Sequence, residues 1–509
     1  MNLRNLDVDS GWLPWLAALP LMALSAGAEA AAGDVSVSQI SASPDWSAGE
    51  GWVTSAARDP QLLTAVWTGL PYAMPLSAIL SEPGPHPIHC GLAYSSDGGK
   101  TWVESSLPYQ AVGLPTNAGG CADPTLVEGP DGTLYSVFNG GSVIPGLGTT
   151  SPALPSLATL TYSEDGGRTW SAPTHVWSVE NFPQNTLDTG QPDLAFDRPW
   201  LTIDPATSTM YASLSDDSIG QRVVLASRDR GITWGTAYPL DPDGQTTWGD
   251  QIAAAHGIVA AAYAVNPGSI RYLASPSPAV TCDDVCAVFQ SSTDDGRTWE
   301  RTLIPVENPR PGPMTPAVVG LQLAADPSKA GRFAVLIPKA SSFEVWITPD
   351  RGATWVSAFT SSAASGDKLA HPTIAFATSG ALGVVWRSVH ADKSYDITAA
   401  VSRDGGTTFD PDVVLTPGAA PANASGEPES PGDDCACNLH LDDTYLDTTW
   451  GDSRTGQRQL WFARYEYASS PTSNAPPSAQ SPTSGSGGAF TILSLWFLLT
   501  VRLSRRVIR

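Results

Sequence analysis

The chain has 509 residues, of which 42% are hydrophobic and 15% charged, so it can bury a large core and is not a disordered protein. Acidic residues outnumber basic ones by 50 to 27, and the formal net charge is −23. A surface this acidic repels phosphate backbones, which excludes nucleic-acid binding. The 47 glycines and 44 prolines favour many short strands joined by turns over long helices.

The N-terminal end has the pattern of an export signal. Residues 11–28 form an apolar stretch that ends in small residues, which fit an A-x-A cleavage motif. The sequence therefore predicts a signal peptide over residues 1–30, although the single arginine among the first ten residues is offset by two aspartates. An N-terminal membrane anchor is the alternative, but Pro14 and Pro20 interrupt a run that is already short for a span.

The C-terminal end has the pattern of a surface attachment. Residues 468–488 are rich in Ser, Pro, Thr and Gly and carry no charged side chain, which predicts an extended linker. The apolar run and basic end of residues 489–509 predict a transmembrane sorting or anchor tail with a cytoplasmic C-terminus. With Gly487 and Gly488 before it, this tail resembles the GlyGly-CTERM sorting tails of Gram-negative bacteria, which implies its removal and transfer of the protein to the cell surface or its release. Both interpretations of the tail, as a sorting signal or as a simple membrane anchor, place residues 34–467 outside the cytoplasm.

One octapeptide returns six times in the middle of the chain, with the pattern S/T-x-D-x-G-x-T-W/F. Its physical chemistry is that of a tight turn, since the Asp can accept turn N–H groups and the Gly supplies a positive φ. The closing Trp or Phe is large enough to fill the space between neighbouring sheets. We expect these aspartates to be structural rather than catalytic, and they are Asp97, Asp165, Asp229, Asp294, Asp350 and Asp404.

The repeat length indicates the fold. Each octapeptide follows an alternating strand, two further strand-like runs precede that strand, and the repeats are 54 to 68 residues apart. Four-stranded units at this spacing are typical of a β-propeller, so the predicted fold is all-β. The octapeptides resemble the Asp-box (BNR) repeats of the sialidase-like propeller superfamily, and the resemblance covers about residues 34–467.

The ends of the repeat region decide the number of blades. After the sixth octapeptide, residues 438–466 supply three strands without a fourth, and the segment that follows Asp34 can complete this blade from the other end of the chain. This arrangement closes the ring and leaves no exposed edge, which favours seven four-stranded blades. Six blades, the number in sialidases, is the alternative.

The candidate site lies on one face of the propeller. The octapeptide turns share one face, whereas the long insertions fall on the other, where binding residues concentrate. Polar residues at the starts of inner strands, including Asn438, are expected to surround the channel mouth there, although they could simply cap strand ends. The predicted ligand-binding residues are Asp123, Asp197, Arg198, Asp250, His371, Arg387, His440 and Arg454.

Six cysteines in an exported chain suggest disulfides. The predicted blade geometry brings Cys90 and Cys121 together on one face, and two further pairs are close in sequence, namely Cys282 with Cys286 and Cys435 with Cys437. Metal binding by the CACNLH segment is the alternative for the last pair, but no second ligand pair at zinc spacing is present. We therefore predict no cofactor and no catalytic metal, and a structural cation is left open.

The resemblance to sialidases implies three arginines that hold a sugar carboxylate, a Tyr–Glu nucleophile pair and an Asp acid/base. The first-arginine signature is absent here, because Arg58 stands in AARDPQL, and no convincing catalytic Glu is present. Arg198, Arg387 and Arg454 are the best candidates for an arginine cluster. The sequence thus predicts an exported, surface-associated propeller that binds glycans or an extracellular protein, without an assigned catalytic residue. The alternatives are a glycoside hydrolase of the exo-α-sialidase type and a structural envelope protein.

The predicted processing can be tested by mass spectrometry of the native protein. The mature chain should start near residues 29–31 and end near Gly487 or Gly488. A surface form that retains Arg509 would contradict the sorting tail, and a retained Met1 would contradict the signal peptide.

Overall fold

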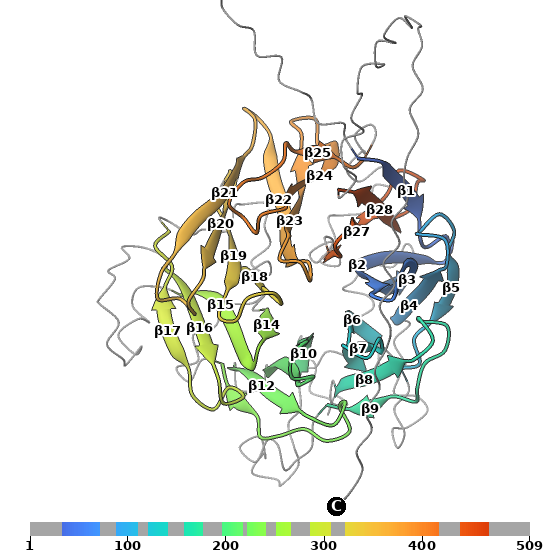
Figure 1. Cartoon of the computed structure of the whole chain (residues 1–509). Helices are drawn as coiled ribbons and strands as arrows, with labels where there is room; N and C mark the ends of the chain where they lie inside the picture. Colours follow the sequence, from blue (N-terminus) through green and yellow to red (C-terminus); the bar gives the residue numbers. More distant parts are fainter. Residues whose placement is uncertain are drawn as a thin grey trace, which may run out of the picture. The chain divides into compact units, whose positions relative to one another are not determined.

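The computed structural model describes residues 33–71, 88–109, 121–140, 157–176, 196–216, 221–240, 251–265, 286–306, 321–339, 341–416 and 438–467. Within these ranges the regular structure is entirely β, and seven four-stranded antiparallel sheets are arranged as blades around a central axis (Figure 1). The expected β-propeller with seven blades is confirmed, and the six-blade alternative is wrong. No helix in the described ranges is long and apolar enough to cross a membrane. The predicted signal peptide, linker and tail lie outside the described residues.

The blades follow one another along the chain, and we number them 1 to 7 in that order. Blade 1 consists of β2 (Trp46–Ala56), β3 (Asp59–Pro71), β4 (His89–Ser95) and β5 (Val103–Ser106). Blade 2 consists of β6 (Cys121–Glu128), β7 (Leu134–Gly140), β8 (Leu157–Ser163) and β9 (Thr174–His175). Blade 3 consists of β10 (Phe196–Ile203), β11 (Met210–Asp216), β12 (Gln221–Ser227) and β13 (Tyr238–Pro239). Blade 4 consists of β14 (Ile252–Ala255), β15 (Ile258–Val265), β16 (Cys286–Ser292) and β17 (Glu300–Leu303). Blade 5 consists of β18 (Gln322–Ala325), β19 (Phe333–Pro338), β20 (Ser342–Thr348) and β21 (Val356–Ser362). Blade 6 consists of β22 (Lys368–Phe376), β23 (Leu382–Val389), β24 (Tyr395–Ser402) and β25 (Val413–Val414).

Blade 7 is built from both ends of the described chain. Its inner three strands are β26 (Asn438–Leu441), β27 (Tyr445–Asp452) and β28 (Gln459–Glu466), and its outer strand is β1 (Val35–Gln39). Strand β1 pairs antiparallel with β28, from Val35 opposite Tyr465 to Gln39 opposite Trp461. The predicted closure by the N-terminal segment is thereby confirmed. The innermost strands also contact each other in order around the channel, with β26 next to β2.

The octapeptide turns share one set of hydrogen bonds. In the first, the Ser95 hydroxyl donates to Asp97 at 2.8 Å and accepts from the Gly99 amide at 2.9 Å, while Asp97 accepts from both the amide and the hydroxyl of Thr101. The other five turns repeat this arrangement. The Thr101 hydrogen bonds lower the pKa of Asp97 to about 2. A carboxylate so strongly held in its ionised form is unsuited to acid–base chemistry near neutral pH.

The same turns join neighbouring blades. The closing aromatic ring packs on the preceding blade, as Trp102 does against Phe462 with ring centroids 5.3 Å apart, and Phe409 against Phe359 at 4.6 Å. Gly99 has φ +83°, and a Cβ there would lie 2.2 Å from the Phe462 ring. Glycine is therefore required for two reasons, namely the backbone conformation and the close approach of the preceding blade.

Substitution of this glycine should destabilise the domain. In Gly99→Val the backbone of residue 99 must keep a left-handed conformation, which costs about 1–2 kcal/mol, and the added side chain must displace Phe462, which adds about 1–3 kcal/mol. The matched control is Gly257→Val, because Gly257 also has a positive φ but a Cβ there meets nothing within 4 Å. Denaturant unfolding should show the larger loss for Gly99→Val. Equal stability of the two variants would contradict the packing role.

Candidate functional site

The two ends of the channel differ in the connections they carry. The hairpins between the first and second strands of each blade lie at one end together with the octapeptide turns, because successive strands run in opposite directions. The connections between the second and third strands, and those between blades, start and end at the opposite end, which we call the loop-rich face. Examples are the connection from Pro71 to His89 and the one from Val265 to Cys286.

Four of the innermost strands have a β-bulge toward the loop-rich face. The register shifts between Gly49 and Trp52 in β2, and at corresponding places in β6, β10 and β22. Three bulge residues other than glycine have a positive φ: Glu50 at +54°, Asp123 at +52° and His371 at +48°. Such conformations cost about 1–3 kcal/mol each and cluster at functional sites, and the other six non-glycine residues with a positive φ in the described ranges lie in connections between strands. A bulge also redirects a side chain, so these three positions are candidates for ligand contact.

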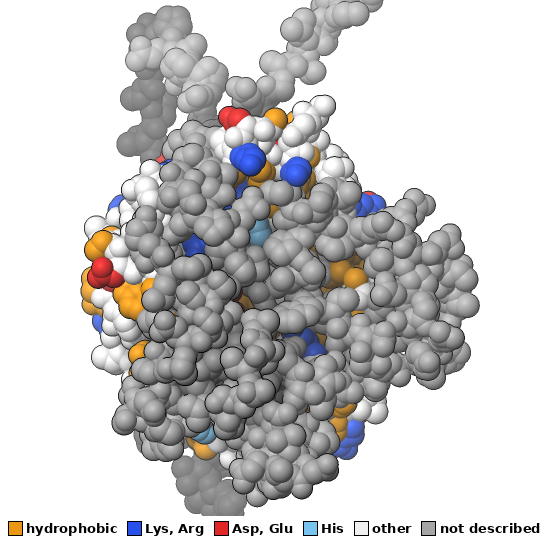
Figure 2. All heavy atoms as spheres, turned by 180° about the vertical axis from the view of Figure 1, so that it is seen from behind, with side chains coloured by type: hydrophobic (Ala, Val, Ile, Leu, Met, Phe, Trp, Pro, Cys, Tyr) orange, Lys and Arg blue, Asp and Glu red, His pale blue; other side chains and the backbone are white. Residues whose placement is uncertain are grey.

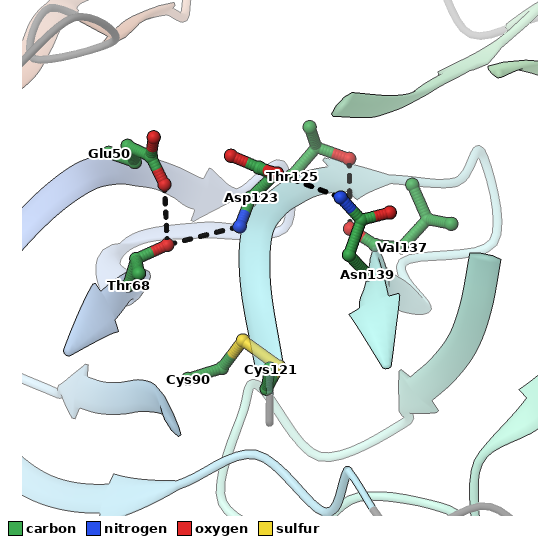
Figure 3. The surroundings of a disulfide bond; sticks show 8 residues. All are labelled: Glu50, Thr68, Cys90, Cys121, Asp123, Thr125, Val137 and Asn139. Carbon is green, nitrogen blue, oxygen red and sulfur yellow. Dashed lines mark hydrogen bonds between the residues drawn. A yellow bond between two sulfur atoms is a disulfide. The ribbon is translucent and has the colours of Figure 1, made fainter. Parts of the chain in front are cut away.

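Hydrogen bonds connect the bulges of blades 1 and 2 (Figure 3). The Thr68 hydroxyl donates to Glu50 at 2.7 Å and accepts from the Asp123 amide at 3.0 Å. The Asn139 side-chain amide donates to the Asp123 carboxylate at 2.8 Å. Thr68 and Asn139 are next to the bulges on the second strands of their blades. The Glu50 and Asp123 carboxylates thus belong to one network that crosses the blade boundary.

A disulfide also links blade 1 to blade 2. Cys90 at the start of β4 is bonded to Cys121 at the start of β6, with Cα atoms 5.2 Å apart, as predicted (Figure 3). Cys286 is also disulfide-bonded, whereas the predicted partner Cys282 and the pair Cys435 and Cys437 lie outside the described residues. Blades 1 and 2 are therefore joined covalently on the loop-rich face, which stiffens the wall that carries Glu50 and Asp123.

Arg387 is part of the blade 6 wall. It lies on β23 opposite Ala370, beside the bulge that carries His371. Its guanidinium stacks on the Tyr395 ring at 4.4 Å, and the side chain is 7% exposed. His371 is similarly buried at 8%. The structure thus places both residues near the mouth, but mostly inside the wall.

Arg454 is held in the connection between β27 and β28. Its Nε and Nη2 donate to the buried Asp452 at 2.9 and 2.7 Å, and its guanidinium lies 4.6 Å from the Trp461 ring. The charge of Arg454 is thus neutralised by a partner two residues away. Figure 2 views the ring from the side opposite to Figure 1, and the described Lys and Arg side chains visible there lie at separate places rather than in one basic patch.

His440 does not join this group. Its Nε2 lies 2.9 Å from the Ser55 hydroxyl and its Nδ1 3.1 Å from the Thr54 hydroxyl, near the end of β2. Ser55 is five residues beyond Glu50, roughly 16 Å along a strand. The placement of His440 at the loop-rich mouth is therefore corrected, because His440 is only two residues before the hairpin that begins at Asp442. Burial lowers the pKa of His440 to about 4.

The remaining predicted residues are Asp197, Arg198, Asp250 and Asn438. Asp197 and Arg198 lie at the bulge of β10, and the predicted Asp250 lies outside the described residues. Asn438 begins β26, and its side-chain oxygen accepts from the Val53 amide at 2.8 Å, which ties blade 7 to blade 1. Among the described residues, no group of three His, Cys, Asp or Glu side chains could hold a metal ion.

Sequence reasoning missed Glu50 and a histidine clasp on the loop-rich face. His390 follows β23, and its Nδ1 lies 3.1 Å from Asp367 while its Nε2 lies 2.9 Å from Asp396. Both partners are carboxylates, so both ring nitrogens donate when the imidazole is protonated, and the clasp is complete in that form. Hydrogen bonds from the two carboxylates raise the pKa of His390. The clasp joins the link from blade 5 to blade 6 with a hairpin of blade 6.

No family model matches the chain, and no curated protein matches it. Similar solved structures include a protein of unknown function from Dyadobacter fermentans, at 14% identity and TM-score 0.48 over 85% of this chain and 99% of that one. They also include the Hadza microbial sialidase Hz136, at 15% identity and TM-score 0.40 over 76% and 74% of the two chains. The phage phi92 endosialidase is a third, at 10% identity and TM-score 0.42 over 90% and 72%. These likenesses concern the fold alone.

The histidine clasp predicts a pH-dependent stability. Since the folded-state pKa of His390 is raised above its unfolded value of about 6.5, the clasp stabilises the fold fully below that pH, and this contribution is lost as the pH rises through the folded-state pKa. His390→Gln should therefore lower the melting temperature more at pH 5.5 than at pH 9. His256→Gln is the control, because the His256 ring contacts the Pro327 carbonyl instead of a carboxylate. A pH-independent effect of His390→Gln would contradict the clasp.

Proposed function

We propose that this protein is an exported, surface-associated propeller that binds glycans at the loop-rich mouth of its channel. The observation that carries the proposal is the set of bulge residues Glu50, Asp123 and His371, all near the same end of the channel and all with a positive φ. Polar residues that only cap the ends of strands would not require a backbone with a positive φ. Polar groups held in advance by a rigid scaffold are what recognition of a hydroxyl-rich ligand in water requires.

Two further features support the proposal. The long connections, where binding residues of rigid scaffolds concentrate, start and end at the same face as the bulges. The disulfide between Cys90 and Cys121 is expected of an oxidising compartment. Export by residues 1–30 and attachment through residues 489–509 are part of the proposal and rest on the sequence patterns.

Glycoside hydrolysis is the second candidate function. Hydrolysis of glycosidic bonds generally uses two carboxyl groups on opposite sides of the scissile bond. Glu50 and Asp123 come from neighbouring blades and are connected through the Thr68 hydroxyl, so one pair of carboxyl groups is present at the mouth. Binding is favoured over hydrolysis because the sequence lacks the catalytic residue set that the resemblance to sialidases implies.

A glycan array and a panel of fluorogenic glycosides, both applied to the purified protein, test the proposal. We expect glycan binding without turnover, and loss of that binding in Asp123→Ala. Asp59→Ala is the matched control, because Asp59 is exposed in the hairpin at the opposite end of blade 1. Turnover that depends on Asp123 would favour the hydrolase. Absence of both binding and turnover would contradict the proposal and favour a protein partner or a structural envelope role.

A further inference from the structure

We propose that Trp52 and Trp200 form an aromatic platform at the axis of the propeller, on which a pyranose ring of the bound glycan stacks with its apolar C–H face. The inference rests on the proposed glycan-binding function and names the part of the ligand that these residues hold. It depends on where the two indole rings meet, on their exposure, and on the residues that precede them.

The two indole rings meet across the axis of the propeller. Trp52 belongs to β2 in blade 1 and Trp200 to β10 in blade 3, and their ring centroids are 4.7 Å apart. Strand β6 of blade 2 lies between these two strands and contacts both of them (Figure 1). Side chains of two blades that are not neighbours can touch only on the axis side of the strand between them. The pair therefore lies in front of β6 and faces the axis.

Equivalent positions in the four bulged strands show why this contact is possible. Trp52 and Trp200 are each the first paired residue after the register shift, and the corresponding residues of β6 and β22 are Thr125 and Thr373. Thr125 is 4% exposed, and its hydroxyl donates to the Val137 carbonyl of its own blade at 3.4 Å. Because this side chain is small and tied to its own blade, the two large rings can meet in front of β6.

The pair is not a fully buried plug. Both indoles are half-buried, and each packs against an apolar cluster between neighbouring blades. Trp386 and Trp450, which fill the core, are by contrast 2% and 0% exposed. The planes of Trp52 and Trp200 meet at 71°, an edge-to-face arrangement in which the ring that contributes its edge keeps both faces free of the other ring. Part of the indole surface thus remains accessible to solvent.

The platform lies beside a residue that the proposed function assigns to recognition. Glu50 precedes Trp52 by two residues, which is about 7 Å along a strand, and Arg198 precedes Trp200 by the same interval. Each innermost strand runs from the loop-rich face toward the hairpin end. A ligand that enters from the loop-rich face therefore reaches the bulges first and the indole rings next.

This combination of surfaces suits a sugar. A pyranose ring has hydroxyl groups at its rim and C–H groups on its faces, and burial of a face against an indole is favourable because it removes apolar surface from water. Hydrogen bonds from the hydroxyl groups replace bonds to water, so they add little net affinity but fix the orientation. The Trp pair then supplies affinity and the polar bulge residues supply orientation. The ligand class is a pyranose with at least one face free of axial hydroxyl groups.

The test compares tryptophan variants on a glycan array. Purified wild-type protein, Trp52→Leu, Trp200→Leu and Trp170→Leu are applied to the same array, and their melting temperatures are measured. Leucine stays apolar but removes the flat ring, so Trp52→Leu and Trp200→Leu should each lose about tenfold or more in affinity for every glycan that the wild type binds. Trp170→Leu is the matched control, because Trp170 packs against the same apolar cluster as Trp52 but closes an octapeptide turn at the opposite end. It should lose stability and keep full binding.

A second measurement follows the rings in the wild-type protein, so it does not depend on the stability of the leucine variants. The protein is labelled with fluorotryptophan, and the fluorine NMR signals of Trp52, Trp200 and Trp170 are assigned by single substitutions to Phe. The array glycan with the strongest signal is then added. We expect the signals of Trp52 and Trp200 to shift and that of Trp170 to stay in place.

Each other outcome has a distinct meaning. Unchanged binding by Trp52→Leu and Trp200→Leu, or a bound glycan that leaves both of their fluorine signals in place, would overturn the platform and leave the glycan-binding function standing. An equal loss of binding in Trp170→Leu would also overturn it, because the effect would then follow from stability alone. A wild-type protein that binds nothing on the array would contradict the proposed function, and the platform with it.

Discussion

The pairing of β1 with β28 is the interaction on which the rest of the structure depends. Each blade has two faces that must be covered by its neighbours, so a gap in the ring would expose the apolar sides of two blades. The chain closes this gap by supplying the outer strand of blade 7 from its other end. Gly33 shows how tightly the segment is seated, since a Cβ there would lie 1.8 Å from the Glu466 carbonyl oxygen.

Polar contacts around the hairpin end reinforce the ring in addition to the apolar clusters between the blades. Carboxylates accept backbone amides of a neighbouring blade, as Glu128 does from Ala57 and Asp443 from Ser379. His440 performs the corresponding role at the joint between blades 7 and 1, through Ser55 and Thr54. The octapeptide aromatics complete the joints further out. These contacts between blades therefore stabilise the ring at the hairpin end.

The fold could be predicted from the sequence because its signals are local and repeated. Each octapeptide contains the turn, the glycine and the aromatic residue that the contact between two neighbouring blades requires. The strands that flank it show an alternation of apolar and polar residues. The seventh blade was predictable because three strands without a fourth leave an edge that only the segment after Asp34 could cover. The pairing of Cys90 with Cys121 followed from that topology.

The site was only partly predictable, because its contacts run between strands far apart in the sequence. Asp123 and His371 are polar residues at the starts of predicted inner strands, and this position marked them as candidates. Glu50 occupies the same structural position, but it was not among the polar residues assigned to the start of an inner strand. The engagement of Arg387 by Tyr395 depends on cross-strand register, which spacing alone does not reveal.

The mouth is chemically asymmetric, and this asymmetry follows from which blades carry bulges. Among the described side chains, blades 1 and 2 contribute carboxylates, whereas blades 4 and 5 have unbulged inner strands whose preceding or first residues, Gln251 and Gln322, hydrogen-bond to each other. Blade 6 contributes His371 and a stacked, buried arginine. A ligand held by Glu50 and Asp123 would therefore lie against the wall of blades 1 and 2. Because the Cys90–Cys121 disulfide and the Thr68 network brace that same wall, the backbone strain at Glu50 and Asp123 is supported where it occurs.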